Sequence, residues 1–119
     1  MAGMEKKDLE QPDERREFGH GRLDLVSLPN VTIGRAVFEP GWRWSQDVKP
    51  IAGTDSCLQP HTGYVVSGRI ATRMDDGQEL EFGAGEAFYI PPGHDGWTVG
   101  GEPAVVLDIT GMENYAKPT

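Results

Sequence analysis

Alternating apolar and polar positions recur along the chain from residue 18 onward. Residues 22–28 and residues 31–39 each follow the two-residue period of a strand with one buried face. The Pro29-Asn30 pair between these two runs is typical of a turn. The pattern therefore predicts a β-hairpin over residues 22–39.

Glycine and proline separate the remaining apolar runs. Residues 63–74 divide at Ser67-Gly68, which predicts two strands. Asp76-Gly77 is a pair favoured in primed two-residue hairpin turns, so a second hairpin is expected around it. Further strands are expected in residues 39–45 after a turn, in residues 85–93 before a double proline, and in residues 103–110.

The whole pattern favours an all-β domain. No long window after residue 18 has a helical period, and 16 glycines and 9 prolines indicate many turns between short strands. Such spacing is typical of a barrel or sandwich. A chain of 119 residues suits one domain, which we place at residues 18–119.

Residues 1–17 differ from the rest, because they are mostly charged and nearly free of apolar side chains. Such a segment buries too little surface to offset its ordering entropy. We therefore expect a polar, mobile N-terminal tail.

The net charge and the cysteine content limit the expected partners and the expected compartment. The net charge of −8 leaves no basic stripe to neutralise phosphates, so nucleic acid and anionic membrane surfaces are not expected as partners. The sequence contains no apolar run long enough to span a membrane. The single cysteine cannot form an internal disulfide, which favours a reducing cytoplasm.

Candidate chemistry gathers around that cysteine. Asp55, Cys57 and His61 lie within seven residues, and His94 follows the double proline. A β-barrel that brings these segments together would assemble a thiolate and two imidazoles, with Asp55 as a fourth or supporting group. Sulfur and nitrogen ligands suit zinc or ferrous iron. The alternative is that Cys57 is only a small core residue and both histidines are loop residues.

Two sequence blocks resemble those of small single-domain cupins, which are double-stranded β-helix (jelly-roll) barrels. The family's first motif is G-x5-H-x-H-x3,4-E-x6-G, and the segment DSCLQPHTGYVVSG is similar to its second half, ending at Gly68. The second motif is G-x5-P-x-G-x2-H, and GEAFYIPPGHDG matches it at Gly85, Pro91 and Gly93. The resemblance covers the segment from Gly41 to Gly111.

The metal positions of both motifs are altered in this chain. Asp55 and Cys57 stand where the family has paired histidines, and His61 stands where it has glutamate. Gly96 occupies the position of the last histidine, with His94 two residues earlier. The resemblance thus implies a cupin-like fold with a rearranged site on Cys57, His61 and His94, with Asp55 as a further candidate.

Several aromatic residues fall in or beside the same blocks. Each one alone is explained by core packing, but together they are candidates for an apolar pocket at the barrel mouth. This candidate pocket comprises Trp42, Trp44, Tyr64, Phe88 and Trp97.

Two functions follow from these observations. The first is a cupin that binds zinc or iron and a small molecule in the barrel, with the reaction, and whether there is one, left open. The second is a metal-free cupin that binds or senses a small molecule without catalysis. Open sheet edges, and the resemblance to small cupins, also favour a homodimer.

Overall fold

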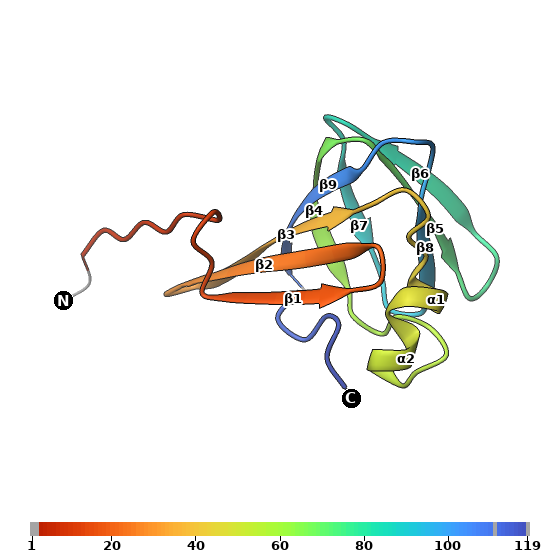
Figure 1. Cartoon of the computed structure of the whole chain (residues 1–119), viewed down its shortest axis with the longest axis horizontal. Coiled ribbons are helices and arrows are strands. Elements are labelled where there is room, and N and C mark those ends of the chain that lie inside the picture. The colour runs from red at the N-terminus through yellow and green to blue at the C-terminus, as the bar shows by residue number, and fades with distance from the viewer. Residues whose placement is uncertain (1–2, 111, 119) are drawn as a thin grey trace.

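A computed structural model describes residues 3–110 and 112–118 as two facing antiparallel β-sheets with two short helices (Figure 1). The elements are β1 (Glu14–Phe18), β2 (Gly21–Leu28), β3 (Val31–Phe38), α1 (Trp44–Asp47), α2 (Lys49–Ala52), β4 (His61–Ser67), β5 (Arg69–Met74), β6 (Glu79–Gly83), β7 (Ala87–Ile90), β8 (His94–Thr98) and β9 (Ala104–Thr110).

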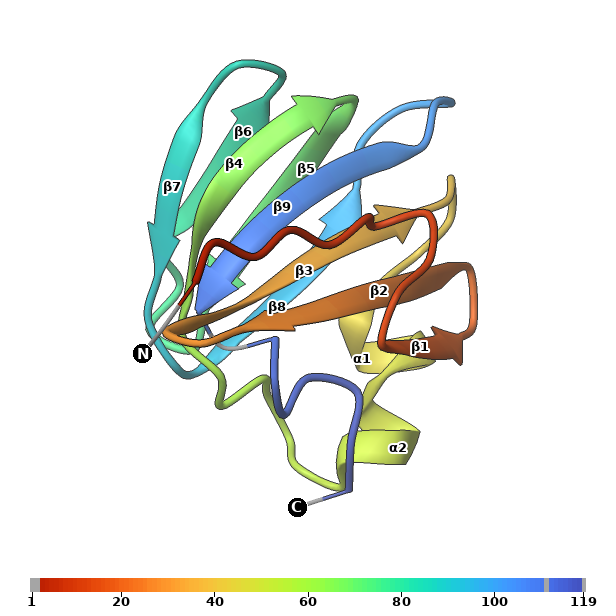
Figure 2. The same ribbon diagram turned by 90° about the vertical axis from the view of Figure 1, so that its left-hand side faces the viewer.

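The larger sheet has the strand order β1-β2-β3-β9-β4-β7 and the smaller one has the order β6-β5-β8 (Figure 2). This arrangement is a cupin-type jelly roll, so the predicted all-β class is confirmed. The two sheets face each other without closing into a continuous hydrogen-bonded barrel. No helix in the described part of the chain is long and apolar enough to cross a membrane.

Both predicted hairpins are present, and one differs in its turn. β2 and β3 pair from Leu28 opposite Val31, on either side of Pro29-Asn30. Four residues lie between β5 and β6, and the Met74 amide donates to the Gln78 carbonyl at 2.8 Å, so the loop closed by this pair has three residues. Gly77 has φ +97°, the left-handed conformation that closes a three-residue loop with a bulge. The predicted two-residue turn is therefore wrong.

Four elements were not predicted from the sequence pattern. α1 and α2 contain four residues each, which is too short for a helical period to be recognised. Residues 44–47 thus form a helical turn where a strand was expected. β8 begins at His94, with one residue between it and the double proline, and β1 begins at Glu14, so residues 14–17 of the expected tail pair with β2.

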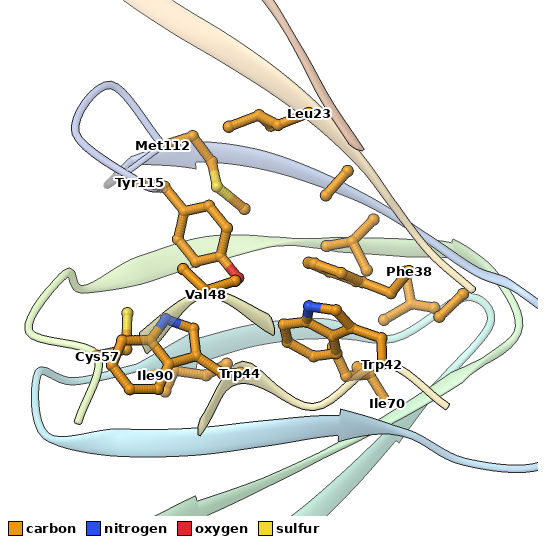
Figure 3. Close-up of a cluster of buried hydrophobic side chains, with 14 of the residues drawn as sticks. Leu23, Phe38, Trp42, Trp44, Val48, Cys57, Ile70, Ile90, Met112 and Tyr115 are labelled. Atoms are coloured by element: carbon orange, nitrogen blue, oxygen red, sulfur yellow. The ribbon is translucent and has the colours of Figure 1, made fainter. Parts of the chain in front are cut away.

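The core lies between the two sheets (Figure 3). Phe38 from β3 stacks on Trp42 with ring centroids 4.0 Å apart, and Trp44 from α1 is also buried. Gly68, at the end of the first cupin-like block, has φ +76°, and a side chain there would collide with the Pro103 carbonyl. The motif glycine is therefore needed for the turn between β4 and β5.

The segment after β9 folds back and covers one end of the core. Met112 and Tyr115 are both buried, and Figure 2 shows this segment beside the loop that precedes β4. Arg16 from β1 holds it in place by donating to the carbonyl oxygens of Met112 (3.0 Å), Glu113 (2.8 Å) and Tyr115 (2.5 Å). β1 thereby fixes the position of Tyr115 at this end of the core.

Candidate metal centre

Three separate segments bring the predicted thiol and imidazoles together. Cys57 lies in the loop between α2 and β4, while His61 and His94 are the first residues of β4 and β8. All three side chains are buried. The Cys57 amide donates to the His94 carbonyl at 2.7 Å, and the Gly93 amide donates to the Cys57 carbonyl at 2.7 Å. The backbone itself thus fixes the thiol beside the second histidine.

Both imidazole rings direct the same nitrogen toward the thiol side of the site. His61 Nδ1 lies 2.7 Å from Asp108 Oδ2, and His94 Nδ1 lies 2.8 Å from the Pro91 carbonyl oxygen. Each acceptor requires a proton on Nδ1, so Nε2 is the nitrogen that carries the lone pair whenever the ring is neutral. Such partners on the far nitrogen are typical of histidines that ligate metals.

The distances fit a tetrahedral ion. The ligand atoms of Cys57, His61 and His94 all lie within 4.8 Å of one another. Cys57 Sγ and His61 Nε2 are 3.6 Å apart. Two such ligands at ordinary zinc bond lengths and a tetrahedral angle are separated by about 3.5 Å. Three protein ligands leave a fourth position open for water or a small molecule.

Without an ion, the same groups form an ion pair. Burial alone would raise the pKa of the Cys57 thiol, but hydrogen bonds and positive charge from His61 and His94 lower that pKa to about 6. Burial opposes charge on His61 as well, yet hydrogen bonds to Asp108 and Cys57 raise its pKa to about 9. The thiolate form, which is the metal-binding form, is therefore favoured at neutral pH.

Asp108 is the residue that the sequence analysis missed. It lies on β9, its side chain is fully buried, and it faces the core together with Ala104 and Val106. The signal was present in the sequence, since the two-residue period places Asp108 on the apolar face of its strand. A carboxylate buried there needs a partner, and His61 provides it.

Asp55 does not join the cluster, which corrects the expectation drawn from strand alternation. Residues 54–56 form a bend rather than a strand, so Asp55 and Cys57 do not share a face. The Asp55 side chain is fully exposed, and its nearest cation is Lys49, whose Nζ lies 3.6 Å away.

The five residues of the candidate aromatic pocket do not all lie in the interior. Trp42, Trp44 and Phe88 are buried in the core. Tyr64 is 44% exposed on the outer face of the large sheet. Trp97 faces away from the core, and the Arg43 guanidinium carbon lies over its ring, 4.4 Å from the ring centroid. These last two residues therefore do not line the interior with the others.

A surface cleft reaches the cluster between α1, α2 and the C-terminal segment. Its lining includes Trp44, Cys57, Gln59 and Tyr115. The Tyr115 ring lies 5.6 Å from that of His61, and burial raises the pKa of its hydroxyl well above the ordinary value, so it remains protonated. Among residues 3–110 and 112–118 this hydroxyl has no hydrogen-bond partner, an arrangement that costs roughly 1–3 kcal/mol in a protein interior.

Fold and site together define a jelly-roll protein with an interior cysteine–histidine cluster. Residues 58–110 match the family model described as the cupin domain. The resemblance to cupins seen in the sequence is therefore confirmed. No curated protein sequence matches the chain.

Solved structures support the fold. A protein of unknown function from Rhizobium leguminosarum bv. viciae 3841 aligns with a TM-score of 0.65 at 22% identity, over 99% of this chain and 100% of its own. KdgF from Halomonas sp. aligns with a TM-score of 0.60 at 17% identity, over 90% and 91% of the two chains. The Lactobacillus farciminis oxalate decarboxylase formate complex gives 0.60 at 18% identity, over 82% of this chain but 30% of its own.

Proposed function

We propose that this protein is a cupin that binds one zinc or ferrous ion on Cys57, His61 and His94 and receives a small molecule beside it. The observation that carries the proposal is the orientation of the two imidazoles. Each is tied through Nδ1 to an acceptor, so Nε2 is the nitrogen available to bind an ion beside a thiol whose ionised form is favoured. The ion would displace the proton that His61 Nε2 shares with Cys57 in its absence.

The choice of metal follows from the donor set. One thiolate and two imidazoles match zinc and ferrous iron, whereas magnesium and calcium prefer oxygen ligands. Bound there, the ion would supply Lewis-acid chemistry to a molecule in the open position. Asp108 would hold the His61 ring in its ligating orientation, and the apolar interior would exclude water.

Elemental analysis of protein purified without a histidine tag tests this proposal. We expect close to one zinc or iron per chain. His94→Ala should bring the content down severalfold, while His20→Ala should retain it, because His20 is exposed and pairs with Asp47 on the surface. Equal metal content in the two variants would contradict the ligand assignment.

A metal-free binding or sensing cupin is the second candidate. It is favoured by the fact that Cys57, His61 and Asp108 can satisfy one another without an ion, at 3.6 Å and 2.7 Å. In that case the metal content stays at background in the wild type. The same elemental analysis separates the two functions.

We also infer a homodimer formed through the outer face of the large sheet. Four apolar side chains on β4, β7 and β9 remain 44–63% exposed there: Tyr64, Val66, Tyr89 and Ile109. Neighbouring apolar side chains on a sheet face are typical of a protein interface. Light scattering should give twice the 13.0 kDa mass of one chain, and Val66→Lys should lower it. A wild-type mass of one chain would contradict the dimer.

A further inference from the structure

An apolar groove opens between β6 and β7, which are edge strands of the two sheets. Its volume is about 50 Å³, and side chains from β5, β6 and β7 line it. Phe82 on β6 contacts Phe88 on β7, with ring centroids 5.5 Å apart, so the two edge strands approach each other there. The groove is separate from the cleft beside Tyr115, because the two share no lining residue.

The groove contains an apolar side chain of the inner face that the protein leaves uncovered. Leu80 on β6 pairs with Thr72 on β5, and residues directly opposite each other in an antiparallel pair point to the same face. Thr72 is 6% exposed inside the fold, whereas Leu80 is 54% exposed. A molecule that covered Leu80 would gain about 25 cal/mol for each Å² of apolar surface removed from water.

The inner end of the groove is formed by neighbours of the candidate metal centre. Ile90 pairs with His61 between β7 and β4, and Met74 pairs with His94 between β5 and β8. Because opposed residues share a face, both apolar side chains point to the same side of their sheets as the two imidazoles. A ligand that fills the groove therefore contacts the residues beside both histidines.

We propose that this groove binds the aliphatic part of a small neutral compound that carries one hydroxyl or carbonyl group. This inference deepens the proposed function, since it names the class of small molecule, and it rests on that function for the ion that the molecule would approach. The groove itself is built from protein side chains alone, so binding to it can be measured without the metal.

The lining specifies the charge and the size of the ligand. None of the lining residues is charged, and the chain has a net charge of −8, so an anion would find no compensating cation there. Since one water needs about 10–15 Å³, a groove of about 50 Å³ has room for roughly three or four carbon atoms. Any further groups would extend into solvent through the open edge.

Thr72 supplies a hydrogen-bonding group in the buried part of the groove. Its side chain belongs to the lining, and its hydroxyl forms no hydrogen bond within residues 3–110 and 112–118. A hydroxyl can both donate and accept, so it can pair with an alcohol or with a carbonyl group. The ligand is therefore expected to carry one such group rather than to be a pure hydrocarbon.

Nuclear magnetic resonance of the methionine methyl groups tests this inference, with isobutanol as the probe. Met74 lines the groove, whereas Met112 is buried at another place in the core, beside Gly34. We expect isobutanol to move the Met74 signal with saturation and to leave the Met112 signal in place. Sodium isobutyrate has the same carbon skeleton but carries a charge, so it should bind about tenfold more weakly or less.

Three variants sharpen the test. Leu80→Asp places a charge in the groove and should abolish binding, and an unshifted Met112 signal shows that its core is intact. Leu58→Asp is the matched control, because Leu58 is 52% exposed but lies outside the groove, so it should bind isobutanol as the wild type does. Thr72→Val removes only the hydroxyl and should weaken binding by about threefold to tenfold.

A Met74 signal that does not respond, or equal binding by Leu80→Asp and wild type, would overturn the inference. Equal binding of isobutyrate and isobutanol would also overturn it, because the ligand would then not need to be neutral. Elemental analysis of the same samples reports on the metal separately, so the groove and the metal centre can fail independently.

Discussion

Two fully buried aspartates lie on opposite faces of the large sheet, and their partners differ in kind. Asp24 on β2 faces outward and is surrounded by arginines, with Arg15 Nε at 2.6 Å and Arg35 at 3.5 Å. Asp108 on β9 faces the core and contacts one imidazole at 2.7 Å. Both carboxylates are neutralised, yet only one belongs to a candidate site.

The arginine and histidine partners differ in whether they can still offer a lone pair to another ligand. A guanidinium has only donors and keeps its proton, so the arginines around Asp24 offer no lone pair to an ion or substrate. An imidazole bound through Nδ1 still has Nε2, which His61 directs at Cys57. A buried aspartate is therefore a structural feature beside arginine and a positioning group beside histidine.

The largest contrast between the two regions should appear when the ligands are removed. The double variant Cys57→Ser/His61→Ala takes away two of three donors, so metal content should fall to background in elemental analysis. Asp24→Asn should retain the full metal content, since the arginine cluster lies on the other face of the sheet. A double variant that keeps its metal would refute the site.

A smaller effect is expected from the supporting carboxylate. Asp108→Asn keeps all three ligands but replaces the acceptor that orients His61, so metal affinity should drop by roughly 10- to 100-fold. Competition with a chromophoric chelator measures this change. Unchanged affinity would show that Asp108 is only a buried structural charge, as Asp24 is.

The Asp24 cluster should affect stability alone. Asp24→Asn removes the charge that Arg15, Arg22 and Arg35 share, and we expect the free energy of unfolding to fall by about 1–3 kcal/mol. The three arginines retain partial access to water, which keeps the loss below that of a fully enclosed pair. Urea unfolding measures it, and a change in metal affinity would contradict the separation of the two regions.

The smallest effect concerns pH in chelator-treated protein. The Cys57 thiolate absorbance should appear with a midpoint at about pH 6, compared with 9.0 for the thiol in its unperturbed state. Cys57→Ser should lack this step. A midpoint near the unperturbed value would mean that His61 does not stabilise the thiolate.

The stability of this metal-free form should vary little with pH. Because the Cys57 pKa is lowered, its contribution is complete above pH 9.0 and is lost as pH falls through about 6. Because the His61 pKa is raised, its contribution is complete below pH 6.5 and is lost as pH rises through about 9. The two changes oppose each other, and a steep slope in urea unfolding between these values would contradict the pair.

Much of the fold was predictable, because strands with one buried face show a two-residue alternation of apolar and polar side chains. The hairpin of β2 and β3 and the strands on either side of Gly68 follow directly from alternation and turn residues. The helical turns α1 and α2 were not predictable in the same way, because four residues cannot display a helical period.

The cupin resemblance predicted part of the site. Cys57, His61 and His94 meet as the cupin resemblance implied. Asp55 was misplaced because the chain bends before Cys57, and a strand period has no meaning there. Asp108 and Tyr115 come from the end of the chain, and their approach to His61 depends on long-range packing that local sequence does not encode.

Anomalous scattering on either side of the zinc and iron edges, from crystals grown without chelators, shows whether Cys57, His61 and His94 hold an ion. We expect one anomalous peak per chain, whose signal rises on crossing either the zinc or the iron edge, about 2.0–2.3 Å from Cys57 Sγ, His61 Nε2 and His94 Nε2. Absence of a peak at both edges, with the thiol and His61 in direct hydrogen-bonded contact, would contradict it.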